Sequence, residues 1–161
     1  MSNYFNRLYK YNAWANNRLI SLIEQNPSVY TGDVEVGLSH CLAAQEIWIS
    51  RIQGRAAIVG GVWEKYTLEH CREIDQMSTD SWLNFLSTAS EQDFFKKIAY
   101  KNTQGDYYET PVIDIMGHWV NHATYHRAQI ARMLRQAGLT PVNTDYITYC
   151  RLHSLDFSSL T

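Results

Sequence analysis

The sequence predicts an all-α fold, a four-helix bundle, from three observations. Four long segments carry apolar residues at steps of three and four, which is the spacing of one face of an α-helix. No segment sustains the alternating pattern of a half-buried strand. With 161 residues, 45% of them hydrophobic and 13% aromatic, the chain can bury about 70% of its unfolded surface. We therefore expect residues 1–161 to form a single domain of four packed helices.

Start and stop signals bound the first two helices. The apolar pattern of the first covers residues 4–20, with Ser2 placed to cap its start, and it should end before Pro27. The second is predicted to begin near Val34 and to end at Gly54, because glycine favours the left-handed conformation that closes a helix.

The pattern loosens after Gly54, and residues 54–77 are expected to form a long connection that contains one helical turn at most. Ser78, Thr79 and Asp80 are N-cap candidates for a third helix. Its apolar residues are Trp82, Leu83, Leu86, Phe94 and Phe95.

A ribbon and a fourth helix complete the predicted elements. Residues 101–109 have turn-forming residues at their centre and tyrosines beside them, which favours a short two-stranded ribbon. Pro111 suits the first turn of a helix that runs from Val112 to Gln136, and Gly138 ends it.

Charge and cysteine content narrow the classes of partner. The net charge of −2 comes from mixed signs without a basic run, so no nucleic-acid partner is expected. Cys41, Cys71 and Cys150 are an odd number of widely spaced cysteines, and the chain does not start like a signal peptide. We expect a cytoplasmic protein with Cys41 as a small buried hydrophobe. No apolar stretch approaches 18 residues, so no membrane span is expected.

Three histidines in the predicted fourth helix form the most informative motif. His118, His122 and His126 follow one another at four-residue steps, so neighbouring side chains lie on one helix face roughly 6 Å apart. His118 and His126 are roughly 12 Å apart along the axis, whereas a metal–nitrogen bond is about 2 Å long. One ion can therefore take His118 with His122, or His122 with His126, and spacing does not choose between the pairs.

A third ligand should come from another helix, because two ligands from one helix do not make a tight site. His40 in the second helix is the best candidate, whereas His70 and His153 are interpreted as surface residues. Three neutral imidazoles would leave a coordination position open, as catalytic metal sites do. Such a ligand set suits Zn²⁺, Ni²⁺, Co²⁺ or Fe²⁺ alike.

Several motifs, spread in order over nearly the whole chain, carry a family resemblance. They are Tyr11-Asn12-Ala13-Trp14-Ala15-Asn16, Leu38-Ser39-His40 with Trp48, Asn121-His122, His126-Arg127-Ala128-Gln129, and Gly138-Leu139-Thr140-Pro141 followed by Asp145-Tyr146. In these motifs the chain resembles the DinB/YfiT-like family of small bacterial metal-binding four-helix bundles. It departs from the family's His-Arg-Gly-Gln pattern at Ala128, a change that a helix tolerates. Arg127 is interpreted as a helix-surface or salt-bridging residue.

The resemblance implies a metal held by His40, His122 and His126, with His118 as a neighbour of the site. It also implies an up-down-down-up topology, with a long crossover between the second and third helices, and a homodimer. Several family members are metal-dependent transferases that activate a low-molecular-weight thiol such as bacillithiol, mycothiol or glutathione, and a related group isomerises maleylpyruvate with a thiol cofactor. The leading hypothesis is therefore a thiol S-transferase that acts on a small electrophilic substrate.

Five more residues are assigned to the surroundings of the metal. Gln45, Gln129 and Asp114 are candidates to hydrogen-bond the ligating histidines. Tyr11 and Trp14 would line the substrate entrance if the first helix faces the metal.

Two other functions are carried as alternatives. A divalent ion can also lower the pKa of a bound water to about 7, which would support hydrolysis of a small ester, amide or lactone. Against this, no glutamate stands beside the histidines as in H-E-x-x-H, and Glu46, six residues after His40, points elsewhere around the helix. The third hypothesis is a non-catalytic, stress-related protein whose metal ion is structural or sensory.

Overall fold

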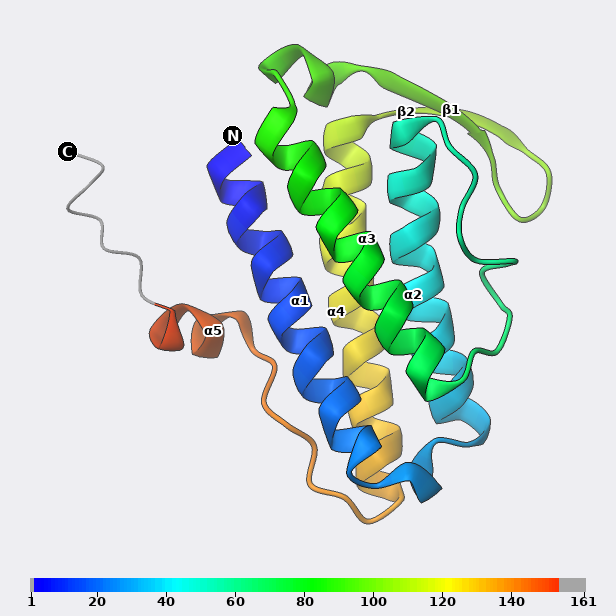
Figure 1. The fold of residues 1–161 in the computed structure, drawn as a ribbon, viewed down its shortest axis with the longest axis vertical. Helices are drawn as coiled ribbons and strands as arrows, with labels where there is room; N and C mark the ends of the chain where they lie inside the picture. The colour runs from blue at the N-terminus through cyan, green and yellow to red at the C-terminus, as the bar shows by residue number, and fades with distance from the viewer. Residues whose placement is uncertain (1, 154–161) are drawn as a thin grey trace.

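A computed structural model of the chain describes residues 2–153 (Figure 1). The described residues are mostly helical, in agreement with the predicted all-α class, and they include one small two-stranded sheet. The elements are α1 (Ser2–Glu24), η1 (Pro27–Val29), α2 (Gly32–Gln53), α3 (Leu68–Thr88), η2 (Glu91–Phe95), β1 (Lys97–Lys101), β2 (Tyr107–Pro111), α4 (Val112–Gln136) and α5 (Tyr146–Leu152).

The four long helices lie side by side with their axes roughly aligned (Figure 1). In that view α1 runs downward, α2 and α3 both run upward, and α4 runs downward again. The most extensive contacts join α2 to α4, α1 to α3 and α2 to α3. The pairing of α2 with α4 brings together the two helices that carry the histidines predicted to share a metal ion. No helix between residues 2 and 153 is both long and apolar enough to cross a membrane.

Two apolar clusters fill the interior of the helical layer. One is built around Trp82 and Trp119 and the other around Leu42 and Ile74, and all four side chains are fully buried. At roughly 25 cal/mol per Å² of apolar surface removed from water, each such side chain contributes about 1.5–3 kcal/mol to folding. The helical pattern of apolar residues therefore accounts for the packing of the long helices.

Most of the predicted boundaries are close to those in the structure. Helix α2 ends at Gly54, whose φ of 64° is the left-handed conformation that favours glycine. Helix α4 covers Val112–Gln136 as predicted, and Gly138 follows it with a φ of 88°. Strands β1 and β2 pair antiparallel, Lys101 opposite Tyr107, and form the predicted ribbon.

The start of the third helix was predicted wrongly. Helix α3 begins ten residues earlier than the N-cap candidate Ser78, directly after Thr67, whose side chain accepts a hydrogen bond from the backbone N–H of His70 at 3.2 Å. Its first turns bury Cys71 and Asp75. The sequence does not show these positions as part of an apolar helix face, because Asp75 is ionisable. The connection between α2 and α3 is consequently limited to residues 54–67.

Two smaller predictions were also wrong. Phe94 and Phe95 lie outside the third helix, in η2, because Ala89 has the extended backbone that ends α3. Ser2 belongs to α1 itself, and its hydroxyl donates a hydrogen bond to the Leu86 carbonyl at 2.9 Å instead of capping the helix. Helix α5 was not predicted.

Candidate metal centre

The histidines His40, His122 and His126 come together between α2 and α4. One ring nitrogen from each can be chosen so that all three lie within 4.8 Å of one another. Two nitrogens bound at about 2.1 Å to one ion are at most about 4.2 Å apart, so small ring rotations suffice for shared coordination. The ring centroid of His40 is 4.6 Å from that of His126, and the His122 and His126 centroids are 4.3 Å apart. These residues could hold a metal ion.

His40 is held from the side of the crossover. Its Nδ1 lies 3.0 Å from the carbonyl oxygen of Val62, and because a carbonyl only accepts, Nδ1 carries the proton. The neutral ring then has its lone pair on Nε2, which is the form that binds a metal. The indole of Trp63 stacks on the same imidazole with centroids 3.9 Å apart and planes 16° apart. The tautomer and the orientation of His40 are therefore both fixed.

The three imidazoles are in the protonation state that metal binding requires. Burial lowers the pKa of His40 and of His126, and burial together with repulsion from the other histidines lowers the pKa of His122 to about 3. All three are neutral at pH 7, so no proton has to leave before a cation binds. The Nδ1 of His122 is also buried without a hydrogen-bond partner in the described part of the chain. Coordination of that ring would offset the cost of leaving it unpaired.

A cavity of about 460 Å³ opens beside the histidines. His40 and His122 contribute to its wall, and so does His118, one turn before His122. The His118 ring stands edge-on to Trp48 with centroids 5.5 Å apart, and burial lowers its pKa. The volume lies in the range of small-molecule sites. A small molecule in this cavity would meet the histidines directly.

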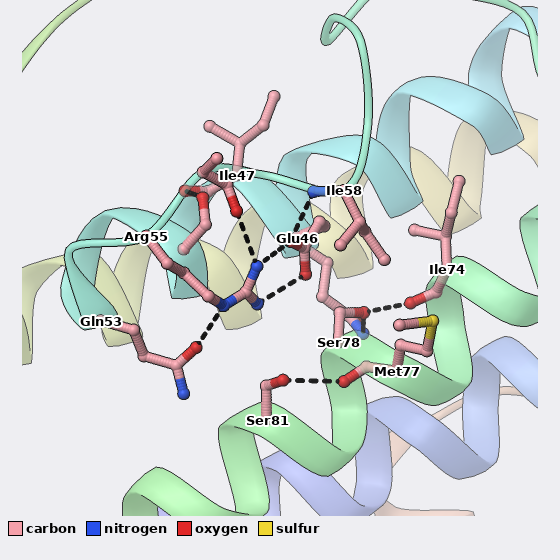
Figure 2. Close-up of polar contacts among 12 residues, drawn as sticks. Glu46, Ile47, Gln53, Arg55, Ile58, Ile74, Met77, Ser78 and Ser81 are labelled. Carbon is pink, nitrogen blue, oxygen red and sulfur yellow. Dashed lines mark hydrogen bonds and ion pairs between the residues drawn. The ribbon is translucent and has the colours of Figure 1, made fainter.

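An ion pair between the buried Glu46 and the partly exposed Arg55 fixes the start of the crossover (Figure 2). The carboxylate of Glu46 on α2 is fully buried, and it accepts hydrogen bonds from Arg55 at 2.6 and 3.2 Å and from the backbone N–H of Ile58 at 3.1 Å. Arg55 follows α2 directly, so these contacts turn the chain back along the helix toward Val62 and Trp63. Glu46 thus acts on the site through the backbone and does not face the cavity.

The predicted surroundings of the metal are found only in part. Gln129 lies near His126. Burial lowers the pKa of the His126 ring, and the hydrogen bond with Gln129 raises it by a smaller amount. The amide of Gln45 instead donates to Ser78 at 2.5 Å, and it accepts from Asn16 at 3.3 Å. Asp114 is exposed in the first turn of α4 and has no hydrogen bond to a histidine in the described residues.

Tyr11 and Trp14 do not line the cavity beside the histidines. Both pack against Tyr149 of α5, and the hydroxyl of Tyr11 donates to the Thr144 carbonyl at 2.8 Å. The condition on which their assignment depended, that α1 faces the metal, is not met. They serve to attach the segment after α4 to α1.

Arg127, predicted as a surface or salt-bridging residue, is buried and forms no ion pair within residues 2–153. Its side chain is 2% exposed and donates to Asn12 at 2.7 Å, to Asn16 at 3.0 Å and to Thr124 at 3.1 Å. It lies 100° around α4 from His126 and so points into the helical layer while His126 points to α2. Cys41 is buried, as predicted, and burial raises its pKa to about 12.

Three groups around the cavity were not predicted from the sequence. These are Trp63 and the Val62 carbonyl, which hold His40, and Arg51, which lines the wall between Trp48 and Tyr100. The first two sit in a connection without periodicity, so the sequence carries no signal for them. Arg51 could have been found, because it lies eleven residues after His40 and hence on the same face of α2.

Two comparisons of the sequence with known proteins identify the family of this chain. The model of the DinB family matches residues 1–154. Protein DinB of Bacillus subtilis (strain 168) is 27% identical over 165 residues, which cover 92% of this chain and 95% of that protein. The family match spans both helices that carry the three histidines. The chain belongs to the DinB family.

Proposed function

We propose that this protein is a divalent-metal-dependent enzyme of the thiol S-transferase type, with His40, His122 and His126 as the metal ligands. The observation that carries the proposal is the grouping of these neutral imidazoles beside a cavity large enough for a small molecule, with His40 and His122 in its wall. A closed structural site would be filled by protein ligands on all sides, whereas three ligands leave a position for a substrate. When bound, the cation would stabilise a thiolate at neutral pH.

The nucleophile has to come from outside the protein. Cys41 and Cys71 are fully buried, and burial raises the pKa of both thiols. No cysteine lines the cavity in the described part of the chain. This favours a low-molecular-weight thiol as co-substrate, in keeping with the resemblance of the sequence to thiol-using relatives.

The proposed reaction transfers sulfur to carbon. The sulfur of the thiol forms a bond to an electrophilic carbon of the second substrate, and the bond from that carbon to its leaving group breaks, so that the leaving group departs with the electron pair. His118 faces the same cavity and is neutral at pH 7, because burial lowers its pKa, so it can take up the thiol proton. Val62 and Trp63 keep His40 oriented throughout.

Hydrolysis is less well supported by the cavity. No carboxylate lines it among residues 2–153, and Glu46 is engaged by Arg55. A metal-dependent hydrolase would therefore lack a carboxylate as general base, and His118 would have to take that role. The non-catalytic alternative predicts that metal stabilises the fold without any turnover.

We also propose the domain organisation and the oligomeric state that the sequence led us to expect. The scaffold is a single-domain bundle of residues 1–161 with up-down-down-up topology and a crossover between α2 and α3. It works as a homodimer in the cytoplasm. Light scattering of the purified protein tests the dimer directly, and a monomer at micromolar concentration would contradict it.

The test combines elemental analysis with a thiol-consumption assay. Protein loaded with Zn²⁺, Ni²⁺, Co²⁺ or Fe²⁺ is mixed with bacillithiol or glutathione and 1-chloro-2,4-dinitrobenzene, and the thioether is followed by absorbance. We expect turnover that depends on metal and thiol and that His122→Ala abolishes. His70→Ala, which changes an exposed histidine of α3, should keep the wild-type rate. A rate that survives removal of the metal contradicts the proposal, whereas ester cleavage without thiol would favour the hydrolase.

A further inference from the structure

One stripe of α2 forms a wall of the cavity beside the histidines. Its members are His40, Ala44, the adjacent pair Ile47 and Trp48, and Arg51, and the spacing of three and four residues from His40 to Ala44, to the pair and on to Arg51 keeps them on one helix face. His40 and Arg51 mark the two ends of this stripe, three helical turns or roughly 16 Å apart along the axis. The cavity thus extends from the histidines at one end to a guanidinium at the other.

Arg51 is the one residue with a permanent charge among those that line the cavity in the described chain. The other lining residues are apolar, aromatic, neutral histidine or uncharged polar side chains, and none is acidic. No carboxylate lies within ion-pair distance of Arg51 among residues 2–153. A cation that is partly buried without a counter-ion costs free energy, and burial lowers the pKa of Arg51 accordingly.

The Arg51 guanidinium is nevertheless held in place. Its central carbon lies 4.6 Å from the ring centroid of Trp48 and 4.6 Å from that of Tyr100. One terminal nitrogen donates to the carbonyl oxygen of Lys101 in β1 at 3.0 Å. The other nitrogens have no hydrogen bond in the described residues, and none of them is a fully buried atom. A fixed fork with free donors facing a cavity matches a carboxylate in two-point contact.

We infer that Arg51 binds the carboxylate of an elongated small molecule whose apolar or aromatic part lies along the α2 stripe and whose other end reaches the histidines. The inference rests on the proposed function for the reacting end, and it names the class of substrate: a monocarboxylate with an apolar body. Trp48 and Tyr100 provide the apolar surface, and the ribbon residues Asn102 and Thr103 provide polar groups at the same end of the cavity. A cationic molecule would meet Arg51 without any acidic partner, so the cavity selects against it.

The experiment compares an acid with its neutral amide. Binding of 4-phenylbutyrate and 4-phenylbutyramide is measured by titration calorimetry on the metal-free and on the Zn²⁺-loaded protein. We expect the acid to bind the wild type at least about tenfold more tightly than the amide in both forms, because a charge-assisted, two-point contact contributes more than a neutral one. Arg51→Met should abolish this preference, and Arg51→Lys, which keeps the charge but not the fork, should retain part of it.

Arg132→Met is the matched control, since it removes the same charge from an exposed position of α4 away from the cavity. It should keep the full preference for the acid. Equal binding of acid and amide to the wild type, or a preference that survives both Arg51 variants, overturns the inference. Thermal melting and Zn²⁺ affinity of each variant show that the fold and the histidine site are intact.

The outcomes separate this inference from the proposed function. If Arg51→Met binds Zn²⁺ like the wild type and still prefers the acid, the anion site is wrong and the metal site stands. If removal of the metal leaves the rate of thiol transfer unchanged while the metal-free protein keeps its Arg51-dependent preference, the anion site stands and the metal-dependent reaction fails.

Discussion

Glu46 and Arg55 form a two-point ion pair in which the two terminal guanidinium nitrogens reach the buried carboxylate, at 2.6 and 3.2 Å (Figure 2). The pair ties the start of the crossover to α2, and the same crossover later supplies the carbonyl and the indole that hold His40. The contact of Glu46, six residues after His40 on α2, thereby affects the orientation of His40. The connection runs through a backbone that has no regular hydrogen-bond ladder of its own.

Glu46→Gln should weaken metal binding as well as the fold. The amide keeps the shape of the side chain but offers one acceptor oxygen instead of two, so Arg55 and the Ile58 N–H lose part of their partner. We expect the free energy of unfolding to fall by about 1–3 kcal/mol. This is less than for a fully buried ion pair, because solvent screens Arg55, which is 33% exposed. Co²⁺ affinity, measured by visible absorption, should fall by about tenfold.

Glu35→Gln provides the control for this prediction. Glu35 pairs with Lys65 at 2.8 Å, and this pair also joins α2 to the crossover, but both partners are partly exposed. Its loss should change the free energy of unfolding by less than about 1 kcal/mol. Equal effects of the two substitutions on Co²⁺ affinity would show that the buried Glu46 carboxylate has no special role in positioning His40.

The choice between the two histidine pairs of α4 can be tested by substitution. His126→Ala and His40→Ala should each lower Co²⁺ affinity by more than about 100-fold, the upper end of what loss of a ligand's hydrogen-bond partner costs. His118→Ala should leave the affinity within about threefold, because the described geometry groups His122 with His40 and His126. Comparable losses in the His118 and His126 variants would refute this assignment.

The part of the site that could be predicted from the sequence is the part fixed by one helix. The four-residue steps of α4 place its histidines on one face whatever the rest of the chain does. His40 is the best candidate for a third ligand from its place in another predicted helix, whereas the choice of His122 with His126 comes from the family resemblance. The pairing of α2 with α4, which brings the three together, is not determined by spacing. Trp63 depends on the path of the crossover, and that path is set by Glu46 and Arg55, whose partnership is not visible as a periodic pattern.

The late predicted start of the third helix has a related physical cause. Its first three turns bury Asp75 and Ser78, polar residues that a search for apolar spacing reads as surface. They are tolerated inside because Asn16, 59 residues before Asp75, donates to its carboxylate at 2.8 Å, and Gln45 donates to Ser78. Buried polar groups need such partners, and the partners come from other helices.

Arg127 should contribute strongly to stability through this polar layer. Arg127→Leu would leave the side-chain oxygens of Asn12 and Asn16 buried without their donor. At about 1–3 kcal/mol for each unsatisfied group, we expect urea denaturation to show a loss of about 2–4 kcal/mol. Arg135→Leu, on an exposed face of the same helix, should change stability by less than about 0.5 kcal/mol. A small effect of Arg127→Leu would mean that water or repacking replaces the guanidinium.

Asp75 gives the protein a pH dependence with a defined sign. Burial raises its pKa from 3.8 to about 6, although hydrogen bonds from Asn16 and Gln45 and the charges of Arg72 and Arg127 act in the lowering direction. Between pH 4 and 6 the folded protein therefore holds a proton that the unfolded chain has released, so this group makes the fold less stable as pH rises. The penalty is complete above pH 6 and amounts to about 3 kcal/mol at most.

Asp75→Asn removes this titration while it keeps an acceptor for Asn16. Relative to the variant, the wild type should become less stable as the pH is raised from 4.5 to 7.5, which is measured as the difference between their melting temperatures at each pH. Using the difference cancels the contribution of the histidines, whose lowered pKa values act in the opposite direction over the same range. Asp80→Asn, on the exposed face of α3, should show a constant difference. If the wild type instead gains stability over the variant with rising pH, the Asp75 carboxylate is better stabilised in the folded state than in the unfolded chain, and the cations Arg72 and Arg127 outweigh its burial.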